Sequence, residues 1–256
     1  MSKKGIVLAG GNGTRLRPLT YVTNKSLLPV FDKPMIYHPI ETLKSLGCDD
    51  VMVVSSSEHV GQVVQLLGSG RSMGIKISYE IQDEARGIAH ALGMCEDWSN
   101  GESVTVILGD NIYCDNDALI SAYEKSYNGI GACVFVKQVF DPERFGVATI
   151  DWNSNKITKI VEKPTNPESK YAVTGLYAYD NKVWDIIRGL KPSDRGEYEI
   201  TDVNNWYVNN SKMSFVQVDS PWIDAGTHES LVEATLSIKN HRAWKSKMKA
   251  MKQTAN

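Results

Sequence analysis

Residues 5–20 read GIVLAGGNGTRLRPLT, and this stretch decides the expected fold. The apolar run at residues 5–9 predicts a short, buried β-strand. Three of the next four positions are glycine. Glycine adopts positive φ and lets backbone N–H groups come close to an anion. The stretch therefore predicts a strand that ends in an anion-binding turn, with the guanidinium of Arg15 beside it.

The turn differs from two common nucleotide-binding signatures. No GK[ST] follows at the spacing of a P-loop, and Leu16 stands where a GxGxxG motif requires its third glycine. A dinucleotide-binding unit would also place an acidic residue at the end of its second strand, where residues 55–57 are three serines. An NAD-dependent oxidoreductase is therefore disfavoured.

Strand and helix signals alternate along the chain after this turn. Apolar runs and 3.6-residue periodicity predict strands at 51–54, 75–81 and 104–108, and helices at 35–46, 60–67 and 87–95. This order predicts an α/β fold with a Rossmann-like mixed, mostly parallel sheet and helices on both faces. Ligands collect at the carboxyl ends of such strands, where the turn at residues 10–15 and Asp110 lie.

The second half of the chain is richer in strands. These are predicted at 132–136, 146–151, 157–162, 172–179 and 213–218, with helices at 184–190 and 229–249. Since no linker or repeat interrupts the pattern, we expect one domain over residues 1–240, in which the parts 1–130 and 131–227 share a core. Residues 228–256 are expected to form a C-terminal helix and a basic, solvated tail.

Composition excludes several classes of protein. The net charge of -2 offers no field for binding nucleic acid or an anionic membrane, and no stretch approaches the length of a membrane helix. Four widely spaced cysteines show no metal-ligand spacing, and the first apolar run is too short for a signal peptide. We therefore expect a cytoplasmic protein with buried thiols and no nucleic-acid or membrane partner.

The glycine-rich turn closely resembles the signature GGxGTRLxPLT of the sugar-1-phosphate nucleotidyltransferases. The resemblance extends over roughly residues 4 to 240. The residues of its motifs are most similar to those of the short form of the thymidylyltransferases in that family. Further matching motifs occur in the same order: NKSLLP at 24–29, DKPM at 32–35, Gln82 with Gly87, GDN at 109–111, FG at 145–146, VEKP at 161–164, VTGLY at 173–177, RGE at 195–197, EITDV at 199–203 and WIDAGT at 222–227.

The resemblance implies transfer of a nucleotidyl group from dTTP to glucose 1-phosphate, giving dTDP-glucose for deoxysugar and surface-polysaccharide synthesis. A sugar phosphate is already anionic at neutral pH, so the nucleophile needs no general base. The obstacle is repulsion between two polyanions, and cations with a metal ion remove it. The five histidines therefore receive no catalytic role. A homo-oligomer, dimer or tetramer, is also implied.

The resemblance assigns site residues motif by motif. Asp110 and Asp224 are expected to hold Mg²⁺, because this ion prefers carboxylate oxygens together with substrate phosphates. Arg15 is expected to stabilise the transition state, Lys25 to hold the triphosphate and Lys163 to hold the sugar phosphate. The nucleotide-binding part (1–130) would use Leu8, Gly10, Gly11, Gly13, Thr14, Arg15, Lys25, Gln82 and Gly87, and the sugar-binding part (131–227) would use Gly146, Glu162, Lys163, Val173 and Tyr177 beside Asp110.

Several alternatives remain open at this point. UTP or CTP could replace dTTP, because one methyl group on the base is worth only about 1–3 kcal/mol in a pocket. A non-catalytic sugar-nucleotide sensor on the same fold is less favoured, since the four charged residues assigned to the reacting phosphates and metal are all present. For Val173 and Tyr177 a plain core-strand role competes with pocket lining. For Gln82, which follows an alternating strand, an exposed position is the open alternative to base recognition.

Overall fold

A nine-stranded mixed sheet runs through the chain. The computed structural model describes residues 3–254, with side chains for residues 3–247. The strands of this sheet are β1 (Lys3–Leu8), β4 (Cys48–Ser56), β5 (Lys76–Gln82), β6 (Val104–Leu108), β8 (Ala132–Gln138), β9 (Gly146–Asp151), β10 (Lys156–Glu162), β11 (Tyr171–Tyr179) and β12 (Met213–Gln217). Their order is β10-β9-β11-β6-β1-β4-β5, with β8 paired to β11 and β12 paired to β8.

The strands of the first half are parallel, as the sequence predicts. β5, β4, β1 and β6 pair parallel to one another. Leu8, at the end of β1, lies opposite Val54 of β4 and opposite Leu108 of β6. The carboxyl ends of these strands therefore meet at one edge, so the segments that follow them converge in space although they are distant in sequence.

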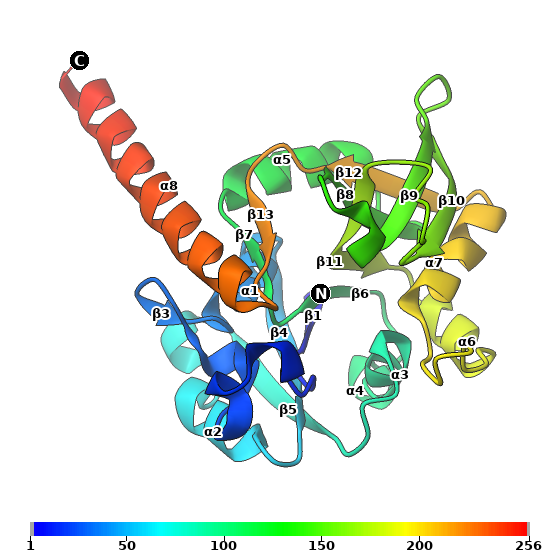
Figure 1. Ribbon diagram of the computed structural model, residues 1–256, viewed down its shortest axis with the longest axis horizontal. Coiled ribbons are helices and arrows are strands. Elements are labelled where there is room, and N and C mark those ends of the chain that lie inside the picture. Colours follow the sequence, from blue (N-terminus) through cyan, green and yellow to red (C-terminus); the bar gives the residue numbers. More distant parts are fainter. Residues whose placement is uncertain (1–2, 255–256) are drawn as a thin grey trace.

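Helices cover both faces of the sheet (Figure 1). Successive residues of a strand point to opposite faces, so Ile6 joins one hydrophobic cluster and Val7 joins the other. The cluster around Ile6 includes side chains of α3 (Ile88–Gly93), α6 (Lys182–Arg188) and α7 (Ile200–Asn209). The cluster around Val7 includes those of α1 (Tyr37–Ser45), α2 (Val60–Leu67) and α5 (Asn116–Ser126).

The second half of the sheet is antiparallel around β11. One edge of β11 pairs with β6 near its carboxyl end and with β9 near its start, and its other edge pairs with β8. The register with β8 shifts between Val173 and Tyr177. Gly175 lies in this shift, and a β-carbon there would come within 2.6 Å of the Asn111 side chain. Only glycine allows this close approach of strand and loop.

Several elements were not predicted. Helices α5, α7 and α4 (Glu96–Ser99) are additional, and two short strands, β7 (Asn111–Tyr113) and β13 (Trp222–Asp224), form a separate antiparallel ladder. A hairpin of β2 (Pro29–Val30) and β3 (Lys33–Pro34) precedes α1. The predicted helix at 35–46 begins later, at Tyr37, which places Pro39 in its first turn, where proline is tolerated.

The C-terminal helix α8 (His228–Thr254) extends away from the rest of the molecule (Figure 1). It confirms the helix predicted at 229–249, whereas the last two residues of the expected tail, 255 and 256, lie outside the described residues. Among residues 3–254, no helix combines the length and the apolar composition that crossing a membrane requires. All four cysteines are buried and unpaired by disulfides, as expected.

Candidate active site

A cleft of about 700 Å³ opens at the carboxyl edge of the parallel strands and is lined by both halves of the chain. It collects all of the predicted site residues except Gly13, which belongs to the turn but does not line the cavity. The lining includes Leu8, Gly10, Gly11, Thr14, Arg15, Lys25, Gln82 and Gly87 from the first part, and Asp110, Gly146, Glu162, Lys163, Val173, Tyr177 and Asp224 from the remainder.

Two side-chain hydrogen bonds fix the backbone of the glycine-rich turn. Gly13 has a φ of 58°, which favours glycine, and its carbonyl accepts a hydrogen bond from the Thr20 hydroxyl at 2.7 Å. The buried amide of Asn24 donates to the carbonyl of Ala9 at 2.9 Å. Gly13 therefore shapes the turn rather than lining the cleft, while Gly10 and Gly11 face the cavity.

Lys25 and Asp110 form an ion pair in the cleft, with side chains 17% and 7% exposed. Burial by itself lowers the pKa of Lys25, but the charge and hydrogen bond of Asp110, together with the charge of Asp224, outweigh burial and raise the pKa above 10.5. Burial also opposes ionisation of Asp110, yet Lys25 holds the pKa of this carboxyl below 3.8. Both side chains are therefore charged at neutral pH.

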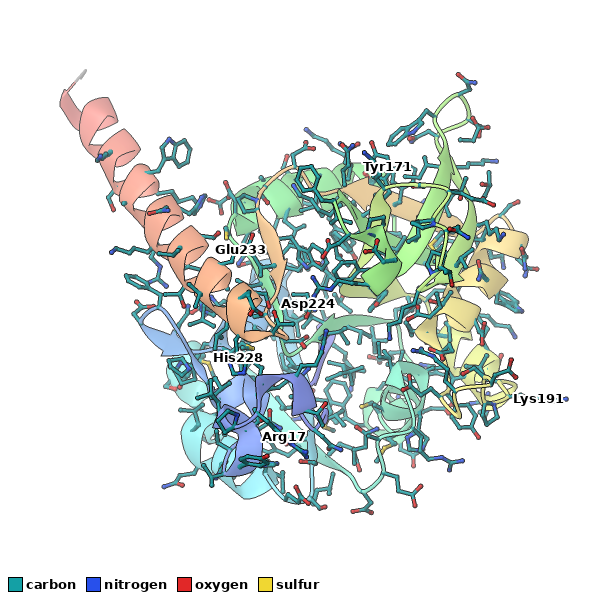
Figure 2. All side chains as sticks on the ribbon, viewed as in Figure 1. Arg17, Tyr171, Lys191, Asp224, His228 and Glu233 are labelled. Carbon is teal, nitrogen blue, oxygen red and sulfur yellow. The ribbon has the colours of Figure 1, made fainter. Side chains whose placement is uncertain are left out.

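The β7–β13 ladder places Asp224 beside Asp110. The N–H of Ala225 donates to the carbonyl of Asp110 at 2.9 Å. Burial, followed by repulsion from the Asp110 carboxylate, raises the pKa of Asp224 to about 6. Figure 2 shows Asp224 near the centre of the molecule, at the foot of α8. Two carboxylates from distant parts of the chain thus act on each other within one site.

Two arginines approach Asp224. Arg15 and Asp224 both pack against Gly226, where a β-carbon would lie 2.7 Å from Arg15 Nη2 and 3.0 Å from Asp224 Oδ1. Arg144 comes from the other half of the chain, with Nη2 at 3.8 Å from Asp224 Oδ2. Its Nη1 donates to Asp141 at 2.6 Å. Cations therefore surround this carboxylate from both halves of the cleft.

The donor set of the two aspartates suits a hard divalent cation such as Mg²⁺. Carboxylate oxygens are its preferred protein ligands, and it often takes only one or two of them with substrate phosphates. Within the described residues, no cluster of three or more histidine, cysteine, aspartate or glutamate side chains is arranged to hold a metal ion. An ion bound between Asp110 and Asp224 would therefore depend on phosphate oxygens to complete its coordination.

One end of the cleft is lined largely by apolar residues. Gln82, the last residue of β5, is only 6% exposed, so the alternative of an exposed strand end is wrong. Its Oε1 packs against the turn, 2.3 Å from where a β-carbon at Gly10 would lie. Gly87 has a φ of 103°, and its missing side chain leaves room for the backbone of Tyr198. Leu8, 8% exposed, completes this end.

The other end is polar. Glu162 accepts a hydrogen bond from the Thr201 hydroxyl at 2.6 Å, and Gly146 leaves space in front of both side chains. Lys163 has a positive φ of 43° just after β10, and its Nζ lies 3.7 Å from Glu162 Oε1. The chain leaves the sheet at Lys163. The basic side chain of Lys163 and the acidic side chain of Glu162 both line the cleft at this point.

The two competing roles of Val173 and Tyr177 coexist. Val173 is 8% exposed and Tyr177 is 4% exposed, and both belong to the hydrophobic cluster around Ile6. Both also line the cleft. They are core residues of β11 whose outer surfaces form its wall.

A protein-family model described as nucleotidyl transferase matches residues 4–241. The chain belongs to the nucleotidyl transferase family. It is 44% identical to a glucose-1-phosphate thymidylyltransferase of Neisseria meningitidis over 235 residues, which cover 90% of this chain and 81% of the relative. It is 42% identical to an enzyme of the same name from Xanthomonas campestris over 234 residues, which cover 91% of this chain and 79% of that enzyme.

Solved structures of the family have the same fold. A Bacillus anthracis protein described as a glucose-1-phosphate thymidylyltransferase, in complex with a sucrose, is 49% identical with a TM-score of 0.85, covering 93% of this chain and 95% of the other. A UDP-glucose pyrophosphorylase complexed with UDP-glucose is 26% identical with a TM-score of 0.80, covering 96% of this chain and all of that chain. The predicted α/β fold is therefore confirmed at the level of the family.

Several cleft residues of this nucleotidyl transferase received no role from the sequence, among them Arg144, Thr201 and Asn204. Arg144 stands just before the matched FG motif, and Thr201 stands inside the matched EITDV motif without an assigned task. Asn204 is 1% exposed and accepts a hydrogen bond from the Tyr179 hydroxyl at 2.7 Å. For Thr201 and Asn204 the available signal was their polar character beside apolar positions of the same helix.

Proposed function

We propose that this enzyme transfers dTMP from dTTP to glucose 1-phosphate, giving dTDP-glucose and pyrophosphate, with Mg²⁺ bound to Asp110 and Asp224. The observation that carries the proposal is one cleft in which two interacting carboxylates, Lys25 and Arg15 stand between an apolar end and a polar end. Relatives named glucose-1-phosphate thymidylyltransferase, at 39–44% identity, support these substrates.

The reaction needs charge neutralisation rather than a general base. A phosphate oxygen of glucose 1-phosphate attacks the α-phosphorus of dTTP and forms the new P–O bond. The bond from the α-phosphorus to the bridging oxygen breaks, and its electron pair leaves with pyrophosphate. Because both reactants are polyanions, holding them in line and screening their charges accounts for most of the rate acceleration.

The cations of the cleft share this task. The N–H groups of the glycine turn and Lys25 hold the triphosphate, and Arg15 stabilises the charge that develops on the α-phosphate and the leaving pyrophosphate. Lys163 holds the phosphate of the sugar. Asp110 and Asp224 would hold Mg²⁺, whose positive charge would polarise the α-phosphate and shield the incoming oxygen. In the free enzyme Lys25 neutralises Asp110, so the lysine becomes available to phosphate when the carboxylate takes another cation.

The two ends of the cleft suit the two remaining parts of the substrates. The base would lie against Leu8 and the backbone at Gly87, with the Gln82 amide offering a donor and an acceptor to its edge. The pyranose would occupy the space left by Gly146, with its hydroxyls donating to Glu162. Val173 and Tyr177 would form the wall on which the ring rests.

UTP is the second candidate nucleotide, and one comparison favours it. The UDP-glucose pyrophosphorylase with the same fold was solved with a uracil nucleotide sugar. The higher identity to enzymes named for thymidylyl transfer ranks dTTP first. We propose that the product, dTDP-glucose, is used in the synthesis of deoxysugars and surface polysaccharides.

The test is pyrophosphate release measured with dTTP, UTP, CTP and ATP against glucose, galactose and mannose 1-phosphates, each with and without Mg²⁺. We expect dTTP with glucose 1-phosphate to give the highest kcat/KM, and turnover to stop when EDTA removes the metal. A higher kcat/KM with UTP would reassign the nucleotide. No pyrophosphate from any pair would contradict the proposed function.

A further inference from the structure

Arg144 is a cleft residue that the sequence left without a task. It ends the 3₁₀ turn Pro142–Arg144, directly before β9, and its side chain is 37% exposed. The described residues that line the cleft include four basic and four acidic side chains. Three of the basic ones, Arg15, Lys25 and Lys163, have been assigned to phosphate groups. Arg144 is the remaining cation of this lining.

The sugar phosphate needs more positive charge than Lys163 supplies. A phosphate monoester carries close to two negative charges at pH 7. Lys163 has one positive charge, and Glu162 Oε1, 3.7 Å from its Nζ, offsets part of that charge. Because repulsion between the two phosphate-bearing substrates opposes the reaction, a second cation at this end of the cleft would favour it.

The backbone places Arg144 beside Lys163. The N–H of Lys163 donates to the carbonyl of Phe145 at 2.9 Å. Next to this bond, Gly146 at the start of β9 lies opposite Glu162 at the end of β10. Residues 144 and 163 therefore flank the same pair of strand ends, next to the space at Gly146 that the pyranose would occupy.

Two contacts hold the guanidinium of Arg144 in place. Its Nη1 donates to Asp141 at 2.6 Å, and its Cζ lies 5.2 Å from the centroid of the Phe145 ring. The Phe145 ring packs edge-on against Trp222, with centroids 5.4 Å apart. Because Trp222 and Asp224 both belong to β13, this packing fixes the turn that carries Arg144 against the strand that carries the carboxylate.

The guanidinium faces Asp224 without being committed to it. The 3.8 Å from Nη2 to Asp224 Oδ2 is longer than an N–H···O hydrogen bond. The contact is therefore a charge attraction that does not use up the N–H groups at Nη2. A guanidinium has five N–H donors in a planar fork that fits phosphate oxygens. Arg144 can thus face the carboxylate and a phosphate at the same time.

The origin of Arg144 in the chain favours the sugar phosphate over the pyrophosphate. The attacking and leaving groups lie roughly in line, on opposite sides of the α-phosphorus. Arg15, which follows the glycine turn, packs with Asp224 against Gly226 and has been assigned to the pyrophosphate. Arg144 comes instead from the sugar-binding part, beside Lys163.

We infer that Arg144 binds the phosphate of glucose 1-phosphate together with Lys163 and holds its attacking oxygen toward the α-phosphorus. The inference rests on the proposed function, because it requires this substrate in the cleft. The planar fork of Arg144 orients the phosphate, whereas Lys163 contributes a point charge. The same phosphate stays attached to the sugar in dTDP-glucose, so Arg144 contacts the product as well.

Steady-state kinetics of Arg144→Gln in both directions tests the inference. In the forward direction, the KM for glucose 1-phosphate should rise at least about tenfold, as expected for loss of a hydrogen bond to a charged group, while the KM for dTTP stays unchanged. In the reverse direction, the KM for dTDP-glucose should rise and that for pyrophosphate should not. The reverse reaction discriminates because dTDP-glucose contains the sugar phosphate, whereas pyrophosphate comes from the triphosphate.

Arg242→Gln is the matched control. Arg242 is 44% exposed, pairs with Asp32 and lies 5.7 Å from the centroid of the Phe31 ring, so it makes the same kinds of contact outside the cleft. This variant should keep the wild-type KM for all substrates in both directions.

A conservative variant separates charge from geometry. Arg144→Lys keeps the charge without the fork, so its KM for glucose 1-phosphate should lie between those of the wild type and Arg144→Gln. If Arg144→Gln shows no cooperative thermal unfolding, Arg144→Lys replaces it. A wild-type KM for glucose 1-phosphate in that variant would then overturn the inference.

The outcomes also distinguish this inference from the proposed function. Raised KM values for dTTP and pyrophosphate would place Arg144 on the leaving group instead. A lower kcat with every KM unchanged would mean that Arg144 only balances Asp224, and wild-type kinetics would mean that it binds no substrate. Each result overturns the inference and leaves the proposed function intact. A wild-type protein that releases no pyrophosphate from dTTP and glucose 1-phosphate would overturn both.

Discussion

Asp224 lies directly opposite Asn111 in the β7–β13 ladder. The amide oxygen of Asn111 accepts hydrogen bonds from Trp222 Nε1 at 2.7 Å and from the backbone N–H of Gly175 at 2.8 Å. One buried side chain thus ties the ladder to the bulge of β11. The spacing of the two carboxylates at positions 110 and 224 is therefore set by backbone pairing, which keeps two mutually repelling groups together.

Asp110→Asn should lower Mg²⁺-dependent kcat/KM by at least about a hundredfold, because it removes a charge that both an ion and Lys25 require. Pyrophosphate release measures the loss, and circular dichroism checks the fold. The control is Asp117→Asn on α5, an 85% exposed carboxylate paired with Lys245 at 3.0 Å, which should keep wild-type turnover. Near-normal activity of Asp110→Asn would refute its assigned role.

Arg15→Ala should lower kcat far more than it raises the KM for dTTP, because its charge acts mainly on the transition state. Removal of one such group costs about 10²–10³-fold in kcat. Steady-state kinetics with varied dTTP separates the two constants. A change in KM alone would reassign Arg15 to ground-state binding.

Thr201→Val should raise the KM for glucose 1-phosphate by about tenfold to a hundredfold and leave the KM for dTTP unchanged. The hydroxyl donates to Glu162, and loss of a hydrogen bond to a charged group costs about 1.5–3 kcal/mol at most. The control, Thr158→Val, removes an exposed hydroxyl of β10 that bonds a backbone carbonyl. Equal effects of the two changes would count against a sugar-binding role.

Asp224→Asn should change how stability depends on pH. Because burial raises the pKa of Asp224 to about 6 from 3.8, the folded protein binds more protons than the unfolded chain between these values. The stabilisation that this side chain gives in its protonated form is therefore present below about pH 4 and is lost as pH rises through 6. The stability of the variant relative to wild type should thus increase by about 2 kcal/mol from pH 4 to pH 7.

Urea unfolding of both proteins across this pH range measures the difference. It should be done without added metal, because a bound cation would also favour the charged carboxylate. If the difference in the free energy of unfolding between the two proteins stays constant with pH, the pKa of Asp224 is not raised by folding.

Much of the fold could be predicted from local sequence patterns, because the strands of the parallel half are continuous apolar runs. The missed helices lack such a pattern. In α7 the buried positions include Thr201 and Asn204, since this face borders the cleft and is polar for that reason. In α5 only Leu119 is buried, and the one local signal was Asp115, whose side chain accepts from the N–H of Ala118.

Motif resemblance predicted residues that line the cleft, but it could not predict their geometry, and their roles stay predictions. The strands β7 and β13 have three residues each, and their pairing joins segments that are far apart in the sequence. No local pattern indicates such a contact. Arg144 was missed for the same reason, since its approach to Asp224 brings together two segments that are distant in sequence.

The most direct test is a crystal structure with α,β-methylene-dTTP, glucose 1-phosphate and Mn²⁺, with the metal located by its anomalous signal. The account predicts an anomalous peak coordinated by Asp110 and Asp224, the triphosphate over the turn at residues 10–15, and the sugar phosphate at Lys163. Ligands bound outside this cleft, or a metal that contacts neither aspartate, would contradict it.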